Sequence, residues 1–298
     1  MNEGGWRILD LTRGRAAIAV ERGAIVVTTD DVEESVPAAG VTFSSGVLHR
    51  LADHDVVMMM CDWRGIPRSV AQPWADGSRI ASRQIAQTKV SRRLLGQLWQ
   101  EIVRAKVLGQ AATLASVKPR FAPKLAEMAG RISVEDIANV EGEAARYYWP
   151  RLLGKGFVRD HSGEDRVNAL LNYGYGIVRG YGIQAVLSPG LISTLGIWHR
   201  HRANAFNLVS DLMEPFRPAV DYAVLHLPAY SSLRKAETMK MLASVLHLPF
   251  TPAGATLAAE LRALAKRYGR LVEGKRERFE VPVWRGGAHW REGDERWR

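Results

Sequence analysis

Cysteine is nearly absent from this chain, because Cys61 is the only one among its 298 residues. A single thiol cannot form an intramolecular disulfide or a cysteine-based zinc site within one chain. The sequence also lacks any run of about 18 consecutive apolar residues, the length that spans a bilayer. It does not begin with a basic segment followed by an apolar one. We therefore expect a cytoplasmic protein of a reducing compartment, with no membrane partner.

The composition is that of a globular protein, with 47% hydrophobic and 24% charged residues, and the length predicts about two domains. Up to about Trp74 the apolar runs are short, which is typical of strands. The first two runs are separated by a hairpin loop that ends in Gly23. The elements predicted here are strands at 16–20 and 24–27, an extended piece at 41–43, a helix at 45–52 and a buried strand at 55–61.

Beyond residue 76 the apolar spacing becomes helical almost to the end of the chain. The clearest helix runs through Leu94–Leu108, where apolar residues recur at three- and four-residue steps. Further helices are predicted at 134–148, 164–187, 204–227, 233–246 and 252–268. The sequence thus predicts an α+β fold, in which a small N-terminal β domain, residues 1–76, precedes a larger all-α domain, residues 77–298.

Two polar residues are expected to cap helices in the second domain. Ser133 and Asp136 resemble a capping box, which would start the 134–148 helix at Val134. Asn204 is a reasonable N-cap for the 204–227 helix.

Basic residues outnumber acidic ones by 41 to 31, a formal net charge of +10, which favours a polyanionic partner. The excess is concentrated between Arg79 and Lys124, where Glu101 is the one acidic residue. The basic residues of this stretch are Arg79, Arg83, Lys89, Arg92, Arg93, Arg104, Lys106, Lys118, Arg120 and Lys124. Contact with a phosphate backbone is the favoured interpretation, and a solvated basic helix face is the alternative.

A polar stripe lies on the otherwise apolar helix at 164–187. Asn168, Asn172 and Tyr175 are spaced at steps of four and three, so they share one helical face. They indicate either a structural hydrogen-bond network between helices or groups that support a functional site.

Several residues with metal-ligating chemistry are far apart in the sequence. Glu141 sits in the middle of a predicted helix beside Gly142, a costly residue there, which indicates that something packs closely. His199 and His201 flank an arginine in a region that reads as helical, so at most one imidazole should point inward. The acidic residues Asp211 and Glu214 share a helical face directly before a proline, which makes this pair a plausible cation site.

Taken together, these segments resemble a known family. Glu141-Gly142 with the following alanines and tyrosine, then Gly196-x-x-His199, then Asp211-Leu-Met-Glu-Pro-Phe-Arg217-Pro, are similar in order and spacing to the CRISPR-associated integrase. This enzyme is the catalytic subunit of the spacer-acquisition complex. The similarity also covers the Asn168–Tyr175 segment and the helix carrying Lys106, and it is greatest to the type II branch.

The resemblance implies a fold, a metal site and a reaction. In that family a glutamate, a histidine and an acidic residue hold a divalent cation, and the matching residues here are Glu141, His199 and Glu214. Two carboxylates and an imidazole suit Mg²⁺ or Mn²⁺. The implied reaction is attack by the 3′-hydroxyl of an incoming DNA fragment on a phosphodiester of the repeat array. Asp211, His201 and Arg217 would support these ligands or contact DNA.

The resemblance also implies partners. They are double-stranded DNA, a second copy of the chain contacted through the β domain, and a small ferredoxin-like CRISPR-associated subunit that completes a heterohexamer. An RNA-guided effector nuclease is a further implied partner.

Some alternatives remain open from the sequence. His201 competes with His199 for the ligand position, and Glu143 competes with Glu141. The same residues would serve a metal-dependent nuclease that hydrolyses branched DNA, or would be structural in a noncatalytic DNA-binding scaffold. The charge-rich segment 270–298, which carries Trp284, Trp290 and Trp297, is either a frayed tail or a partner-binding arm.

Overall fold

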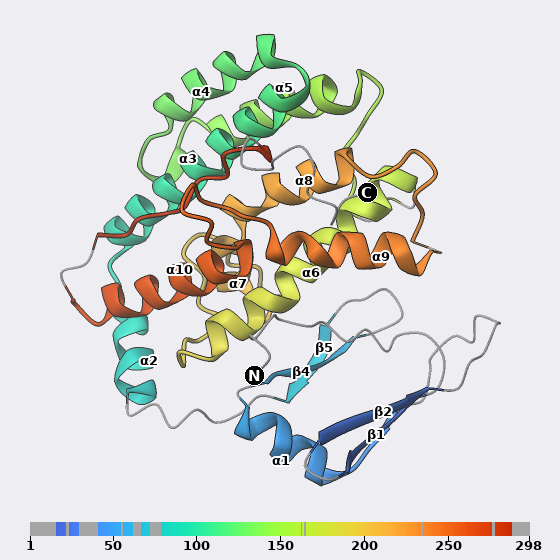
Figure 1. The fold of residues 1–298 in the computed structure, drawn as a ribbon. Coiled ribbons are helices and arrows are strands. Elements are labelled where there is room, and N and C mark those ends of the chain that lie inside the picture. Colours follow the sequence, from blue (N-terminus) through green and yellow to red (C-terminus); the bar gives the residue numbers. More distant parts are fainter. Residues whose placement is uncertain are drawn as a thin grey trace. The chain divides into compact units, whose positions relative to one another are not determined.

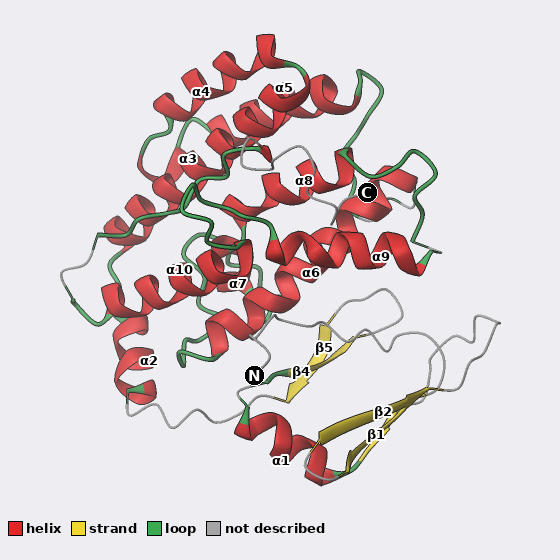
Figure 2. Ribbon diagram, in the orientation of Figure 1, coloured by secondary structure: helices red, strands yellow, loops and turns green. Residues whose placement is uncertain are grey.

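The computed structural model describes residues 16–21, 24–29, 41–54, 56–61, 67–71, 79–161, 163, 165–233, 235–275 and 278–287. The chain divides into two compact units, Met1–Asp76 and Gly77–Arg298. Strands occur in the first unit and helices dominate the second (Figure 2). The predicted α+β class is confirmed. No helix in the described part of the chain is long and apolar enough to cross a membrane.

The N-terminal unit contains a three-stranded sheet in the order β2-β1-β3. The strand β1 pairs antiparallel with β2, with Glu21 opposite Ala24, and parallel with β3. The predicted hairpin is thereby confirmed, although its two loop residues lie outside the described ranges. The elements of this sheet and the helix after it are β1 (Ala16–Glu21), β2 (Ala24–Thr29), β3 (Val41–Phe43) and α1 (Ser45–Asp53).

A second, two-stranded sheet completes this unit. The strands β4 (Met58–Cys61) and β5 (Pro67–Ala71) run antiparallel, with an irregularity between Met60 and Cys61. The expectation of a buried strand at 55–61 is wrong at Met60, which is 38% exposed. A continuous apolar run does not by itself reveal how much of a short strand is covered.

The helical unit is organised around α3 (Arg92–Val117), which extends through it (Figure 1). Ser91 caps this helix by accepting the backbone N–H of Leu94 at 3.2 Å. Trp99 and Ile102 are among its buried residues, which confirms the apolar face predicted from the sequence. The preceding helix is α2 (Ile80–Thr88), and the following elements are η1 (Pro119–Phe121), α4 (Ala122–Arg131), η2 (Val134–Asp136) and α5 (Val140–Leu153).

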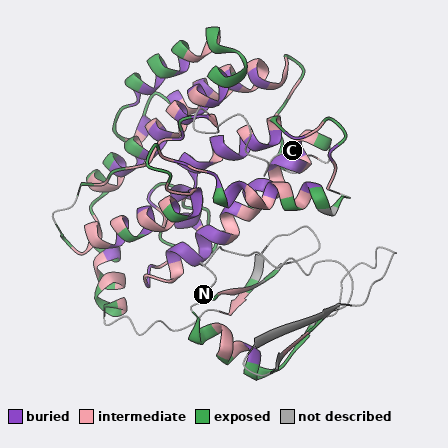
Figure 3. Ribbon diagram, in the orientation of Figure 1, coloured by how far each residue is buried: buried purple, intermediate pink, exposed green. Residues whose placement is uncertain are grey.

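A second long helix, α6 (Arg166–Leu187), packs closely on the elements that follow it. A Cβ on Gly174 would lie 2.6 Å from a methyl of Val220, so only glycine allows this approach of α6 to α8. Buried residues gather along α3, α6 and α8 (Figure 3). The remaining elements are α7 (Asn207–Leu212), η3 (Glu214–Phe216), α8 (Arg217–Leu225), α9 (Ala236–Ala243), η4 (Ser244–His247) and α10 (Leu257–Val272).

The structure corrects three predicted helix boundaries. The helix expected at 204–227 is broken into α7, η3 and α8, because Pro215 has no N–H to donate within a helix. Asn204 is not its N-cap, since its side chain accepts the N–H of Phe206 before the helix begins. The helix expected at 252–268 starts only at Leu257, where the Thr256 hydroxyl caps it.

The third correction concerns the helix that carries Glu141. Ser133 makes no side-chain capping bond, and the turn η2 ends at Asp136. The carboxylate of Asp136 instead accepts the N–H groups of Val140 and Glu141, both at 2.9 Å, and α5 begins at Val140. Glu141 therefore lies in the first turn of α5 and not in mid-helix.

The C-terminal segment packs against the helical unit as far as Gly287. The Trp284 side chain is fully buried and its indole N–H donates to the Thr113 hydroxyl at 3.1 Å. Thr113 in turn donates to the carbonyl of Pro218. The frayed-tail alternative is wrong for 278–287, the partner-binding alternative stays a prediction, and Trp290 and Trp297 lie outside the described ranges.

Candidate active site

Two carboxylates from separate elements meet at one positive charge. The Lys106 ammonium on α3 lies 2.5 Å from Glu141 Oε1 and 2.6 Å from Glu214 Oε2. The Lys106 side chain is 15% exposed and that of Glu214 is 5% exposed. The structure thus brings together two of the three predicted ligands, around a lysine that the sequence had placed among the DNA-binding residues.

The local structure explains how Glu141 reaches this point. Of the non-glycine residues in the described ranges, Glu135, Asp136 and Asn139 have positive φ. This conformation is strained for glutamate and is tolerated by Asp and Asn. It turns the chain so that the Asn139 side chain accepts the N–H of Gly142 at 3.1 Å. The close contact predicted at Gly142 is this N-cap, because a Cβ there would lie 2.7 Å from the Asn139 oxygen.

Glu214 is held by two cations. Its Oε1 accepts from Arg217 Nε at 2.8 Å, while Oε2 faces the Lys106 ammonium without a well-oriented hydrogen bond. Burial alone would raise the pKa of Glu214, but the charges of Arg217 and Lys106 outweigh it and hold that pKa well below its ordinary range. The same carboxylates raise the pKa of Lys106 against the opposing effect of its burial. Both groups are therefore charged at neutral pH.

His199 lies on the loop before α7 and is oriented by Asp211, which is fully buried. The Asp211 carboxylate accepts the backbone N–H groups of Ile197, Trp198 and His199 at 2.5, 3.0 and 3.1 Å. Its Oδ1 also lies 2.5 Å from His199 Nδ1. Since a carboxylate can only accept there, Nδ1 carries the proton and Nε2 is the nitrogen available for ligation or proton transfer.

Two further contacts fix the His199 loop. A Cβ on Gly196 would collide with the carbonyl of His199 and approach Asp211 Oδ2, so the loop closes around the carboxylate only with glycine there. The His199 ring also meets Trp99 edge-on, with ring centroids 5.7 Å apart. The hydrogen bond to Asp211 raises the pKa of His199, with added contributions from the charges of Asp211, Glu214 and Glu141. The imidazole therefore lies within electrostatic reach of both converging carboxylates.

The geometry distinguishes the competing ligands. Glu143 pairs with Arg131 at 2.8 Å on the surface, whereas Glu141 contacts the lysine. His201 is exposed, and its backbone carbonyl accepts from Asn207. Glu141 and His199 are therefore the residues of each pair that face the site.

The donor set suits a divalent cation, but its present arrangement is that of a carboxylate pair holding an ammonium. Within the described residues, no three His, Cys, Asp or Glu side chains are arranged as a complete metal site. One oxygen of Glu214 lies buried 2.6 Å from the Lys106 ammonium, and both carboxylates already converge on this positive charge. Two hard oxygen donors beside an imidazole nitrogen fit Mg²⁺ or Mn²⁺ if the lysine moves aside.

The polar stripe on α6 forms a hydrogen-bond network inside the protein. Asn168 is buried and its Oδ1 accepts from Arg159 Nη1 at 2.9 Å and from the backbone of Asp160. Asn172 accepts from Arg159 Nη2 at 2.6 Å. Asn168 and Asn172 hold the 158–161 segment against α6. Their role is structural, but the network joins a loop to a helix and not two helices as the structural alternative expected.

Tyr175 belongs to a buried network that sequence reasoning missed. The hydroxyls of Tyr175 and Tyr148 both donate to the carboxylate of Asp221, the latter at 3.0 Å. The guanidinium of Arg217 lies 4.8 Å from the Tyr175 ring centroid, so the network supports the residue that holds Glu214. Burial raises the pKa of Asp221 to about 6 against the lowering effect of its two tyrosine hydrogen bonds.

His161 is a second residue that the sequence did not single out. Desolvation and the charge of Arg159 lower its pKa, and the charges of Arg217, Glu214 and Lys106 also act on it. It lies at the end of the segment that Asn168 and Asn172 hold, within electrostatic reach of Glu214 and Lys106. Neither His161 nor Asp221 has a sequence spacing that would have predicted this position.

The basic residues between Arg79 and Lys124 have different surroundings and partners in the structure. Arg79 and Arg83 pair with Glu273 at 3.0 and 3.2 Å, and Lys106 lies in the site. Arg104 forms a long contact with Glu101. The expectation that all of these residues clamp phosphates is wrong for Lys106, which faces carboxylates instead. Exposed side chains at the start of α3 and the end of α2 remain available for DNA: Lys89, Arg92 and Arg93.

Residues 7–247 match the family model of the CRISPR associated protein Cas1. The chain belongs to the Cas1 family. The CRISPR-associated endonuclease Cas1 of Neisseria meningitidis serogroup C (strain 8013) is 30% identical over 233 residues, which cover 74% of this chain and 76% of that relative. The predicted similarity to the CRISPR-associated integrase is confirmed at the level of the family, and the Neisseria relative is consistent with the type II branch.

Solved structures of other proteins share the fold. A casposase bound to its integration product has a TM-score of 0.70 at 17% identity, covering 90% of this chain and 91% of that one. A chain of a Cas6-RT-Cas1–Cas2 complex has a TM-score of 0.68 at 17% identity, covering 92% of this chain and 36% of that one. The α+β architecture is therefore that of Cas1.

Proposed function

We propose that this protein is a metal-dependent DNA integrase that inserts short foreign DNA fragments into a CRISPR repeat array. Membership in the Cas1 family supports a nuclease or integrase role. The observation that carries the proposal is the convergence of Glu141 and Glu214 on one positive charge, within electrostatic reach of an imidazole that Asp211 holds. The casposase with the same fold is described with an integration product, which favours strand transfer.

Glu141, Glu214 and the Nε2 atom of His199 would hold the cation, either Mg²⁺ or Mn²⁺. When bound, a divalent ion polarises a phosphoryl oxygen and orients the attacking group. The Lys106 ammonium must then leave the point between the carboxylates, because the two positive charges cannot share it. Asp211 fixes the His199 tautomer, an arrangement that raises the basicity of a metal-binding imidazole.

The proposed reaction is a transesterification without a covalent protein intermediate. The 3′-hydroxyl of the fragment loses its proton as its oxygen forms a bond to phosphorus in the repeat strand. The bond from that phosphorus to the neighbouring 3′-oxygen breaks, and the released 3′-oxygen takes up a proton. Arg217, beside Glu214, supplies fixed positive charge next to the carboxylates and positions Glu214.

DNA would reach the site along Lys89, Arg92 and Arg93, which are exposed. Contacts from such side chains fix the position of a duplex without reading its sequence. We also propose that the active form contains two copies of this chain in contact through the β domain, joined by a small ferredoxin-like CRISPR-associated subunit in a heterohexamer. The fold neighbour described as a Cas1–Cas2 complex supports a Cas2-type partner. An RNA-guided effector nuclease is a further proposed partner.

Two other functions use the same residues differently. A nuclease would place water where the 3′-hydroxyl attacks and would release cut DNA without joining it. A noncatalytic scaffold would use Glu141, His199 and Glu214 only to stabilise the fold. The site favours a catalytic role because it concentrates acidic groups beside a solvent-accessible histidine, whose side chain is 43% exposed.

One assay separates these functions. The protein and its partner subunit are incubated with Mg²⁺ or Mn²⁺, a labelled fragment with free 3′ ends and a supercoiled plasmid that carries repeats. Integration predicts labelled plasmid, lost in Glu141→Gln and Glu214→Gln while DNA binding is retained. Arg131→Gln, which disturbs only the surface pair with Glu143, serves as the control. Cut plasmid without label would favour the nuclease, and unchanged joining in both variants would overturn the assigned site.

A further inference from the structure

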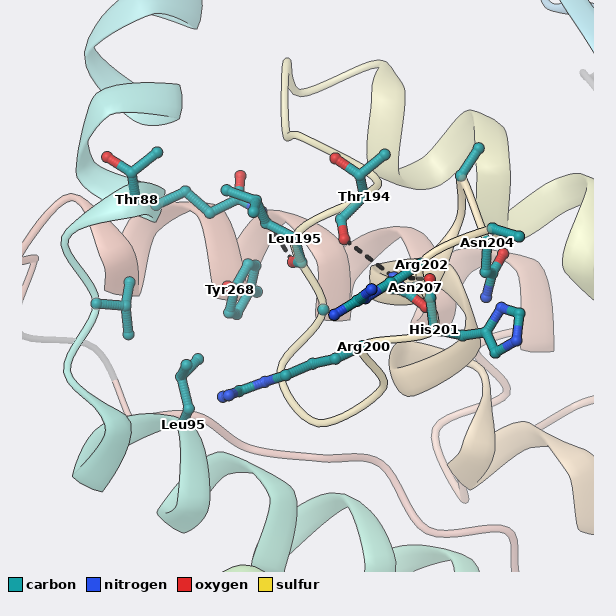
Figure 4. Close-up of a pocket in the computed structure, with 15 residues that line it drawn as sticks. Thr88, Leu95, Thr194, Leu195, Arg200, His201, Arg202, Asn204, Asn207 and Tyr268 are labelled. Atoms are coloured by element: carbon teal, nitrogen blue, oxygen red, sulfur yellow. Dashed lines mark hydrogen bonds between the residues drawn. The ribbon is translucent and has the colours of Figure 1, made fainter.

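The two sides of the proposed metal site have different surroundings. The loop that carries His199 borders a cavity of about 660 Å³, which Gly196 and Arg200 help to line (Figure 4). Glu214 and Lys106 instead lie where η3 meets α3, and both side chains are largely buried. The position of Glu214 therefore depends on what holds η3 and α8 against α3.

Trp284 contacts both sides of this junction. Its fully buried indole donates to the Thr113 hydroxyl of α3 at 3.1 Å. Its ring centroid lies 5.6 Å from that of Phe250, which in turn lies 4.7 Å from that of Phe216 in η3. The Tyr222 ring of α8 meets the indole edge-on, with centroids 5.5 Å apart. One side chain of the C-terminal segment thus joins α3 to η3 and α8.

The Thr113 hydroxyl connects Trp284 to the residues that hold Glu214. It donates to the carbonyl of Pro218 at 2.9 Å while it accepts from the indole, so its one proton and a lone pair are both used. Pro218 follows Arg217, whose Nε donates to Glu214 at 2.8 Å. Two buried hydrogen bonds therefore link the C-terminal segment to the start of α8, directly beside the site.

The face of α3 that contacts Trp284 also carries the lysine of the site. Lys106, Gly109 and Thr113 follow one another at steps of three and four residues, so they share one helical face. A Cβ on Gly109 would lie 3.0 Å from Pro218 and 3.2 Å from the Cβ of Trp284, so glycine allows α3 to approach both closely. A shift of Trp284 is thereby transmitted to the part of α3 that faces Glu214.

The backbone after Trp284 is shaped to this surface. Gly286 has a φ of +75°, and a Cβ on Gly287 would overlap the Tyr222 hydroxyl. This packing lies beyond residue 247, where the match to the Cas1 family model ends. The contact with the site is therefore made by a part of this chain that the family match does not cover.

We propose that residues 278–287, here called the C-terminal strap, position the metal site, with Trp284 as the positioning residue. The proposal rests on the proposed metal-dependent function and adds to it what keeps Glu214 in place. When a cation replaces the Lys106 ammonium, the ion pair between Lys106 and Glu214 no longer ties η3 to α3. The contacts of Trp284 do not depend on that ion pair, so they hold Glu214 at the distance from α3 that the cation requires.

The test measures Mn²⁺ binding in the absence of DNA, from the electron paramagnetic resonance signal of free Mn²⁺. Trp284→Phe removes the N–H donor and keeps an aromatic ring, whereas Thr113→Val removes the hydroxyl that connects the strap to Pro218. Each should weaken Mn²⁺ binding by about tenfold, the size of effect seen when a group that orients a metal ligand is lost. Thr113→Ser keeps the hydroxyl and should bind Mn²⁺ as the wild type does.

Two further measurements separate positioning from a general loss of stability. Leu264→Ala removes a fully buried side chain of α10 and should lower the melting temperature without weakening Mn²⁺ binding. Joining by Trp284→Phe should need about tenfold more Mn²⁺ for half of its maximal rate. The affinity of this variant for DNA in EDTA should equal that of the wild type, because the buried indole lies apart from the exposed arginines that are proposed to contact DNA.

The outcomes distinguish this proposal from the one on which it rests. Trp284→Phe protein that binds Mn²⁺ as tightly as the wild type would overturn the strap and leave the integrase proposal standing. An effect of Thr113→Val alone would do the same, because Thr113 also hydrogen-bonds the Tyr148 hydroxyl. An equal loss in Leu264→Ala or Thr113→Ser would likewise overturn it. Wild-type Mn²⁺ binding that Glu214→Gln leaves unchanged would contradict both proposals.

Discussion

The Asp211 carboxylate binds both the ring and the backbone of His199. Its Oδ1 lies 2.5 Å from the ring Nδ1 of His199 and 3.1 Å from the backbone nitrogen of His199. One fully buried carboxylate thereby sets the loop conformation and the imidazole tautomer at once. These contacts fix the position and orientation of the imidazole, although His199 lies on an irregular loop and not on a helix.

Asp211→Asn should lower both the pKa of His199 and the stability of the protein. The amide NH₂ must face either the backbone N–H groups of Ile197 and Trp198 or the backbone and ring N–H groups of His199, which costs about 2 kcal/mol of unfolding free energy. The raised pKa of His199 means that this pair stabilises the fold fully at low pH and loses its effect as pH rises through that pKa. NMR titration of the ring measures the change. An unaltered His199 pKa would contradict the assigned role, and Glu127→Gln on the surface serves as the control.

Lys106→Met should destabilise the protein in the absence of divalent cations, by about 3 kcal/mol, because two carboxylates lose their shared positive charge. Mn²⁺ should then raise the melting temperature of this variant more than that of the wild type. Thermal unfolding in EDTA and in Mn²⁺ tests both statements. Lys89→Met removes an exposed charge and should change neither quantity. A Lys106→Met protein as stable as the wild type, or one indifferent to Mn²⁺, would show that the ammonium and a metal do not share this position.

Arg92→Ala combined with Arg93→Ala should weaken DNA binding and reduce its salt dependence. Each lost phosphate contact lowers the slope of log affinity against log salt by about one. Fluorescence anisotropy over a series of salt concentrations measures the slope. Arg79→Ala, at a residue paired with Glu273, should have a smaller effect. An unchanged slope in the double variant would place the DNA elsewhere.

Asp221→Asn should change how stability depends on pH. Burial raises the pKa of Asp221 from its ordinary value to about 6, so the folded protein takes up a proton that the unfolded chain releases. This contribution is therefore present at low pH and is lost as pH rises to about 6. Chemical denaturation at about pH 4 and about pH 7 should show wild-type stability falling relative to the variant by about 2 kcal/mol. Parallel pH profiles for the two proteins would contradict the assignment.

Much of the helical architecture was predictable because it follows from local spacing. The apolar pattern of Leu94–Leu108 indicates a helix whatever it packs against, and α3 contains it. The same holds for the α6 helix, whose predicted end at Leu187 is the observed one. The site residues Glu141, His199 and Glu214 were identified by family resemblance, since no periodicity connects positions so far apart in sequence.

The remaining features depend on tertiary contacts that spacing does not encode. Lys106 looks like any residue of a basic run until Glu141 and Glu214 are brought to it from two other elements. Trp284 is buried because it packs against Tyr222 and Phe250 and reaches Thr113, 171 residues earlier in the chain. The helix α5 begins at Val140 and not at the predicted Val134. Asp136 accepts two backbone N–H groups after an unusual turn, in place of the expected cap.

The central claim is that Glu141, His199 and Glu214 hold one divalent cation in place of the Lys106 ammonium. Crystals of the protein grown with Mn²⁺ and measured at a wavelength where manganese scatters anomalously test this claim most directly. If the three residues do so, a single strong anomalous peak is expected within coordinating distance of both carboxylates and His199 Nε2, with Lys106 turned away. A peak elsewhere, or none at this site with the ammonium still between the carboxylates, would contradict it.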